Sequence, residues 1–153
     1  MNASKAAMKE LIGEHEAIMA YMRSMTDSAG KLVAPSADAR QRLCNYRYRL
    51  YDFRDAIWYH LEIDERVFKS VLGEANEDPV AEHREIQRLV DQMIAIADNT
   101  AIEKQGQAEI EQFCRKLEAA FDRICKLIAL HIATENAILE RLQLALSQGG
   151  SSG

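Results

Sequence analysis

The sequence predicts an all-α protein, specifically an up-down-up-down four-helix bundle. Leu, Ile, Ala, Glu, Gln, Arg and Met dominate the 153 residues, which include only 7 Gly and 2 Pro, and this mixture favours helix. Apolar residues recur at three- and four-residue steps, and no stretch shows the sustained alternation of a β-strand. Four such stretches are separated by short segments that contain helix breakers, a pattern typical of a bundle.

The first helix is expected to span about residues 4–27, with one inward stripe of apolar residues and a histidine. Gly30 and Pro35 then break the chain, and Ser36 is a suitable N-cap for the next helix. The second helix is expected over about residues 37–72, and Gly73 ends it. Both helices are long enough to run the length of a bundle.

The third helix is expected to begin at Asp78-Pro79, an N-cap followed by proline at the first helical position, and to continue to about residue 97. Asn99-Thr100 and Gly106 interrupt the pattern. The fourth helix is expected to start between residues 101 and 107 and to reach about residue 147. Residues 1–148 thus form one domain, and the Gly- and Ser-rich residues 149–153 are expected to be a flexible tail of the kind left by an expression linker.

The charge pattern excludes several classes of ligand. The net charge is −5 with acidic and basic residues interspersed, so there is no basic block for nucleic acid. No apolar run is long enough to span a membrane, and the first residues lack a signal-peptide core.

Cys44, Cys114 and Cys125 are an odd number without metal-ligand spacing, which favours reduced, buried thiols. We expect a cytoplasmic protein.

The histidines follow a register that matches the expected helices. There is one histidine on each helix, namely His15, His60, His83 and His131. The midpoint between the first and second histidine lies beside Pro35-Ser36, that between the second and third beside Gly73, and that between the third and fourth beside Gly106. In an antiparallel hairpin, residues equidistant from the turn lie at the same height, since each residue rises 1.5 Å. The four imidazoles are therefore expected to share one layer.

Two carboxylates join this layer. Asp64 and Glu135 each follow a histidine by four residues, so each shares a helix face with it. The first two helices thus resemble the last two, with histidine spacings of 45 and 48 residues. A single buried histidine is more often structural than a ligand. Four histidines and two acids in one buried layer, however, would be costly without pairing or metal.

The number and type of these groups indicate two metal ions. Six donors are too many for one tetrahedral zinc ion, and calcium or magnesium would want oxygen ligands. Two first-row ions bridged by the two carboxylates, with two terminal histidines each, use all six groups. Imidazole with carboxylate suits iron, with manganese or zinc as alternatives. The Glu-x-x-His pairs of ferritin-like di-iron proteins are absent.

With these features the chain resembles the hemerythrin family, specifically the bacterial HHE cation-binding domains. The motifs that carry the resemblance are Glu14-His15-Glu16, His60-Leu61-Glu62-Ile63-Asp64-Glu65, Glu82-His83-Arg84-Glu85-Ile86 and His131-Ile132-Ala133-Thr134-Glu135-Asn136. Each motif is short, but the ordered set is specific, and it spans nearly all of residues 5–147.

The resemblance implies that His15 and His60 bind one iron and that His83 and His131 bind the other. Asp64 and Glu135 would bridge the two ions together with an oxo or hydroxo group. Two departures matter. Oxygen carriers of the family have a second histidine one turn after that of the third helix, where this chain has Gln87. Most relatives also have glutamate in place of Asp64, and the neighbouring Glu65 is an alternative bridge.

Three functions are compatible with such a site. The first is reversible binding or sensing of dioxygen or nitric oxide, favoured by an apolar lining. The second is enzymatic action on peroxide or nitric oxide, or iron donation in the repair of iron–sulfur centres, which the missing histidine favours. The third is iron storage or sensing. Aromatic residues on the second helix favour packing against another chain, as in a homodimer, over a redox role.

Overall fold

The structure is a computed structural model, and it describes residues 2–27, 38–72 and 78–149. In these ranges the chain forms four long helices and one short 3-10 helix: α1 (Asn2–Thr26), α2 (Ala39–Leu72), α3 (Asp78–Ala97), η1 (Thr100–Lys104) and α4 (Gln107–Gly149). No strand occurs in the described ranges. The predicted all-α class is therefore confirmed.

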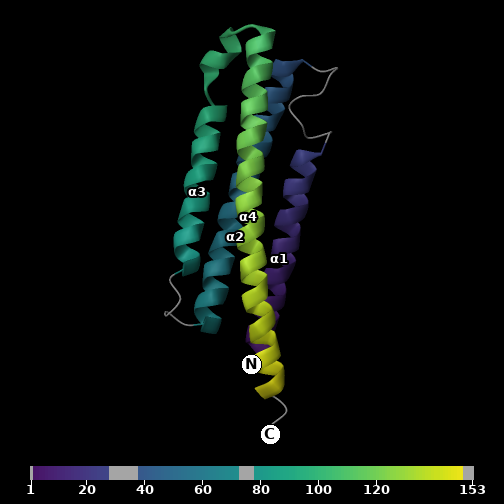
Figure 1. Ribbon diagram of the computed structural model, residues 1–153, viewed down its shortest axis with the longest axis vertical. Helices are drawn as coiled ribbons and strands as arrows, with labels where there is room; N and C mark the ends of the chain where they lie inside the picture. Colours follow the sequence, from purple (N-terminus) through teal and green to yellow (C-terminus); the bar gives the residue numbers. More distant parts are fainter. Residues whose placement is uncertain (1, 28–37, 73–77, 150–153) are drawn as a thin grey trace.

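The long helices lie side by side along the long axis of the molecule, and both chain ends lie at the same end of it (Figure 1). The α1 helix packs against α2 and α4, and α3 packs against the same two helices from another side. The α2 and α4 helices also contact each other directly. This arrangement places α2 and α4 at the centre of the molecule, where the buried faces of all four long helices meet.

The helix bounds agree with expectation to within two residues. Asp38 caps α2, because its carboxylate accepts a hydrogen bond from the Arg40 backbone N–H at 3.1 Å, and the expected cap Ser36 lies outside the described residues. The expected interruption before α4 is η1, whose N-cap Asn99 accepts from the backbone N–H of Ala101. The α4 helix extends to Gly149, into the expected tail. Residues 28–37, 73–77 and 150–153, with most of the expected breakers, lie outside the described residues.

Aromatic packing fills one half of the core. Phe121 of α4 contacts Phe53 of α2 with ring centroids 5.2 Å apart and Tyr46 with centroids 6.1 Å apart, both edge to face. Tyr48 and Tyr59 are instead mostly exposed, and packing of the α2 aromatics against another chain stays a prediction. A second apolar cluster lies near the start of α1 and the end of α4, and it includes Met8, Leu11, Ile63, Val67, Phe68 and Leu139.

The structure also bears on the expected burial of the cysteines and on the expected absence of a membrane span. All three cysteines are free thiols, but only Cys114 is buried. The expectation of buried thiols is wrong for Cys44, because it lies on the outer face of α2. None of the helices in the described residues combines the length and the apolar character that crossing a membrane requires.

Arg47 joins α2 to the segment that connects α3 and α4. Its guanidinium donates to the backbone carbonyl oxygens of Ala97 and Asn99 and pairs with the Glu103 carboxylate. Carbonyl groups at the end of a helix lack partners within the helix. The Arg47 side chain is only 14 % exposed, and its contact with Ala97 is partly buried while those with Asn99 and Glu103 are exposed. Arg47 thus fixes the end of α3 against α2.

Replacing Arg47 with alanine is expected to lower the free energy of unfolding by about 1–3 kcal/mol, since hydrogen bonds to a charged group are lost and carbonyl acceptors stay partly buried. Urea unfolding followed by circular dichroism measures this loss. Arg88→Ala is the control, because Arg88 pairs with Glu85 on the exposed surface of α3 and should cost under about 0.5 kcal/mol. Equal losses for the two variants would contradict this role of Arg47.

Candidate metal centre

The structure brings together all six residues predicted as metal ligands. Each long helix contributes one histidine, while α2 and α4 add a carboxylate one turn further along. None of the six side chains is more than 5 % exposed, although the rest of the buried core is apolar. The six residues are His15, His60, Asp64, His83, His131 and Glu135. One polar cluster therefore lies inside an apolar bundle.

These residues form two groups of four, and the groups share both carboxylates. The first group is His15, His60, Asp64 and Glu135, and the second is Asp64, His83, His131 and Glu135. In each group one donor atom from every residue lies within 4.8 Å of the others. The division matches the pairing of histidines that the sequence resemblance implies. That the residues bind metal stays a prediction.

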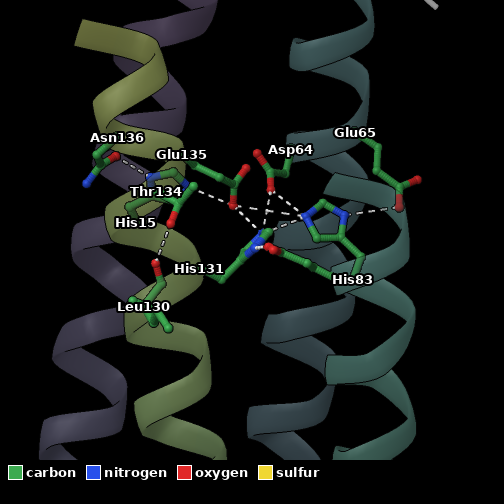
Figure 2. A network of polar contacts seen from close by, with 10 residues as sticks. His15, Asp64, Glu65, His83, Leu130, His131, Thr134, Glu135 and Asn136 are labelled. Carbon is green, nitrogen blue, oxygen red and sulfur yellow. Dashed lines mark hydrogen bonds and ion pairs between the residues drawn. The ribbon is translucent and has the colours of Figure 1, made fainter. Parts of the chain in front are cut away.

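The inner nitrogens of His15, His83 and His131 point toward the two carboxylates (Figure 2). His83 Nε2 lies 2.8 Å from His131 Nε2 and 2.9 Å from Asp64 Oδ2. His131 Nε2 also lies within ion-pair distance of Glu135 Oε1, and His15 Nε2 lies 3.9 Å from the same oxygen. Such a concentration of nitrogen and oxygen lone pairs is stable only around protons or a cation.

Asp64 and Glu65 point in different directions, because they are adjacent residues on the α2 helix. Asp64 is fully buried between the two groups, whereas the Glu65 side chain is 46 % exposed. Glu65 instead reaches the outer nitrogen of His83, with its Oε1 at 3.1 Å from Nδ1. Asp64 is therefore the carboxylate of α2 that lies among the inner nitrogens.

Sequence reasoning missed three residues that hold the histidines from outside. Glu82 Oε2 accepts a hydrogen bond from His131 Nδ1, and Asn136 Oδ1 lies 2.6 Å from His15 Nδ1. Glu65 does the same for His83. A hydrogen on the outer nitrogen leaves the lone pair of Nε2 facing inward, the form that binds metal. Their signal is position, because each directly precedes or follows a predicted ligand.

The cluster leaves buried polar atoms that fit a metal. Buried side-chain atoms of the cluster without a hydrogen-bond partner in the described residues are His15 Nε2, both ring nitrogens of His60, and all four carboxylate oxygens of Asp64 and Glu135. Although His83 Nε2 is close to Asp64, the contact has the distance of an ion pair and lacks hydrogen-bond geometry. Buried polar groups are rarely left in this state, and metal ions satisfy atoms of these types.

In the metal-free protein, the surroundings of the cluster raise the pKa of two histidines and lower that of a third. Burial lowers the pKa of His83, but Asp64 and Glu135 outweigh it and raise the value to about 9. The same balance raises the pKa of His131 to about 10. Burial and the neighbouring His15 lower the pKa of His60 to about 4.

The two carboxyl groups also differ from each other. Burial acts to raise the pKa of Asp64, but His131 and His83 outweigh it and hold the value well below its usual range. Burial raises the pKa of Glu135 despite the same two histidines. Without metal, Asp64 is therefore the carboxylate that balances the protons on His83 and His131.

One surface cavity reaches the cluster, and a second lies beside Glu65. The first, of about 220 Å³, opens between α3 and α4 and reaches His131, and its lining combines the apolar Ile86, Leu127 and Leu130 with the polar Glu82, Glu85 and Thr134. The second, of about 400 Å³, is lined in part by Gln87. Gln87, at the position where oxygen carriers of the resembled family have histidine, thus lines a surface cavity.

Comparison with known proteins yields no relative for this chain. No protein-family model matches it, and neither a curated protein nor a solved structure matches it at a significant level.

Proposed function

We propose that this chain is a hemerythrin-like protein that holds two iron ions and binds or senses dioxygen or nitric oxide. One observation carries the proposal: six buried donors form two groups of four that share Asp64 and Glu135. His15 and His60 would hold one ion, His83 and His131 the other, and the two carboxylates would serve both. Iron held there supplies a redox-active ion with affinity for small diatomic ligands.

The choice of iron rests on the donor set. Each group offers two imidazoles and two carboxylates without a thiolate, and first-row metals such as iron, manganese and zinc accept this combination. Hard ions such as calcium and magnesium prefer oxygen donors alone. Iron fits the proposed ligands best, because dioxygen and nitric oxide bind to redox-active metals and not to zinc.

The surroundings of the cluster support a small, uncharged ligand. The cavity between α3 and α4 leads to His131 along Ile86 and Leu127, and its volume of about 220 Å³ admits a diatomic molecule easily. Apolar residues such as Ile57, Leu61 and Ile128 pack around the cluster and are nearly fully buried. Such a lining limits water at the site.

A second candidate function is an enzyme that acts on peroxide or nitric oxide, or a donor of iron. Gln87 favours it, since the fifth histidine of an oxygen carrier is missing and fewer protein donors surround the ions. An ion with fewer protein ligands accepts a substrate or leaves to an acceptor more readily.

The proposal also includes the up-down-up-down order of the helices. This order is supported by the location of the start of α1 and the end of α4 at the same end of the molecule (Figure 1) and by the close approach of one histidine from each helix. The cytoplasmic location and the homodimer expected from the sequence stay predictions.

Optical spectra of the protein loaded with ferrous iron under anaerobic conditions test the proposal. Charge-transfer bands that appear with dioxygen or nitric oxide and disappear when the gas is removed are expected for a carrier or sensor. Rapid consumption of added peroxide without a lasting spectral change supports the enzyme instead. Ready loss of iron to a chelator on reduction supports iron donation or storage. Absence of bound iron contradicts all three.

Metal uptake is expected to become tighter as the pH rises from 6 to about 9. Because the pKa values of His83 and His131 are raised to about 9 and 10, this pair holds protons at neutral pH that a metal ion must displace. The competition weakens as the pH approaches those values and ends above them. Calorimetric titration in buffers of different protonation enthalpy measures the protons released. Affinity independent of pH between 6 and 9 contradicts the prediction.

A further inference from the structure

The two halves of the cluster are related by an approximate repeat that extends beyond the six inner residues. His15 of α1 corresponds to His83 of α3, and His60 of α2 corresponds to His131 of α4. The residue before the first histidine of each half is glutamate, Glu14 or Glu82. The residue after the carboxylate of each half is Glu65 or Asn136.

The outer hydrogen bonds partly follow this repeat. Glu65 of α2 holds His83 of α3 at 3.1 Å, and its counterpart Asn136 of α4 holds His15 of α1 at 2.6 Å. Figure 2 shows these two contacts on opposite sides of the cluster. The same position in the repeat thus provides a carboxylate to one half and a neutral amide to the other.

The repeat also fails at His60 and His131, whose outer contacts differ. Glu82 holds the outer nitrogen of His131, and the repeat would have Glu14 hold His60. Neither ring nitrogen of His60 has a hydrogen-bond partner in the described residues. Both outer nitrogens of the His83–His131 group therefore contact carboxylates, while the His15–His60 group has one amide contact.

We propose that the two metal positions are unequal, and that Glu65 and Glu82 make the His83–His131 position the tighter one for a divalent cation. A carboxylate on the outer nitrogen orients the imidazole and makes its inner nitrogen a stronger donor. Two carboxylates also add negative charge near one ion and not near the other. The inference rests on the dinuclear site of the proposed function.

Anaerobic titration of the metal-free full chain with Co²⁺ at about pH 9, followed by its visible absorption, tests the inference, because protons compete less for His83 and His131 there than at neutral pH. Two binding steps separated by at least about 10-fold in affinity are expected, because loss of such outer partners typically changes affinity about 10–100-fold. His15→Ala keeps the His83–His131 position and should retain the tight step. His83→Ala keeps the other position and should retain the weak one.

Isosteric variants then identify the groups responsible. Glu82→Gln and Glu65→Gln should each weaken the tight step about 10–100-fold and leave the weak step unchanged. Asn136→Asp should tighten the weak step, a gain that a merely structural role would not produce. Glu85→Gln is the control, and it should change neither step. Glu85 lies about one helical turn from Glu82 on α3, but it pairs with Arg88 at the surface.

The outcomes separate this inference from the proposed function. Two Co²⁺ ions bound with equal affinity, or weakening of both steps alike by Glu82→Gln and Glu65→Gln, overturn the inequality and leave the dinuclear site standing. A tight step that survives in His83→Ala and not in His15→Ala overturns the assignment of the tight position. Binding of one ion or none overturns the dinuclear site itself and the inference with it.

Discussion

Replacing Asp64 with alanine is expected to weaken both metal positions by more than about 100-fold, so that no ion is retained after gel filtration. Asp64 is fully buried and belongs to both groups of four, so its removal takes one donor and one negative charge from each position. Loss of partners outside the ligand set already costs about 10–100-fold. Elemental analysis of the loaded protein after gel filtration measures the effect.

Histidine variants are expected to give an intermediate result. His60→Ala leaves the group around His83 and His131 complete, and His131→Ala leaves the group around His15 and His60 complete. Each variant should therefore keep one ion per chain. Glu62→Ala is the control on the same turn of α2 as Asp64, because Glu62 is exposed, and it should keep two ions.

This series has a clear contradictory result. If His60→Ala and His131→Ala both retain two ions per chain, the two groups are not the metal positions. If Asp64→Ala retains two ions, the carboxylate is not shared between them. Circular dichroism of each variant shows whether the helices are intact.

Replacing Phe121 with alanine is expected to lower the free energy of unfolding of the metal-free protein by about 3–5 kcal/mol. The ring is nearly fully buried and packs edge to face on Phe53 and Tyr46, contacts that add to the transfer of the ring from water. The total free energy of unfolding of a domain of this size is about 5–15 kcal/mol, so the expected loss is a large part of it. Urea unfolding followed by circular dichroism measures it.

Phe113→Ala is the matched control, because Phe113 lies on the same helix but is only partly buried. It should cost clearly less than Phe121→Ala. The metal stoichiometry of a folded Phe121→Ala sample should stay at two, since Phe121 lies ten residues, or about 15 Å of helix, before His131. A loss below about 1 kcal/mol for Phe121→Ala contradicts the aromatic core described above.

Much of the fold was predictable because helix period and helix breakers are local properties of the chain. The α3 helix begins and ends where Asp78-Pro79 and the apolar stripe predict. The capping hydrogen bond of Asp38 could not be predicted, because several residues before α2 are suitable caps and the choice depends on side-chain geometry. The α4 helix continues two residues beyond the expected end, to Gly149, since the Gly-rich tail gives no local sign of helix.

The inner residues of the site were predictable for a geometric reason. A helix rises by a fixed distance per residue, so equal spacing from a turn brings His83 and His131 to one height. The 2.8 Å between their inner nitrogens agrees with that expectation. The face of α2 likewise distinguishes Asp64 from Glu65, since adjacent residues on a helix point in different directions.

The outer contacts could not be predicted in the same way. They depend on which rotamers let Glu82 and Asn136 reach a ring on a neighbouring helix, and spacing alone carries no information on rotamers. The cavity beside His131 depends on how α3 and α4 pack together. The outer contacts are the basis of the proposed difference between the two metal positions, and they could be found only in the structure.

The most direct test of the dinuclear site is the number and coupling of iron ions in the unaltered chain. The protein is loaded with ferrous iron without oxygen, freed of excess metal, oxidised, and measured by elemental analysis and Mössbauer spectroscopy. Two irons per chain that are magnetically coupled are expected, because both groups share Asp64 and Glu135. One iron per chain, or two irons without coupling, would contradict a carboxylate-bridged pair.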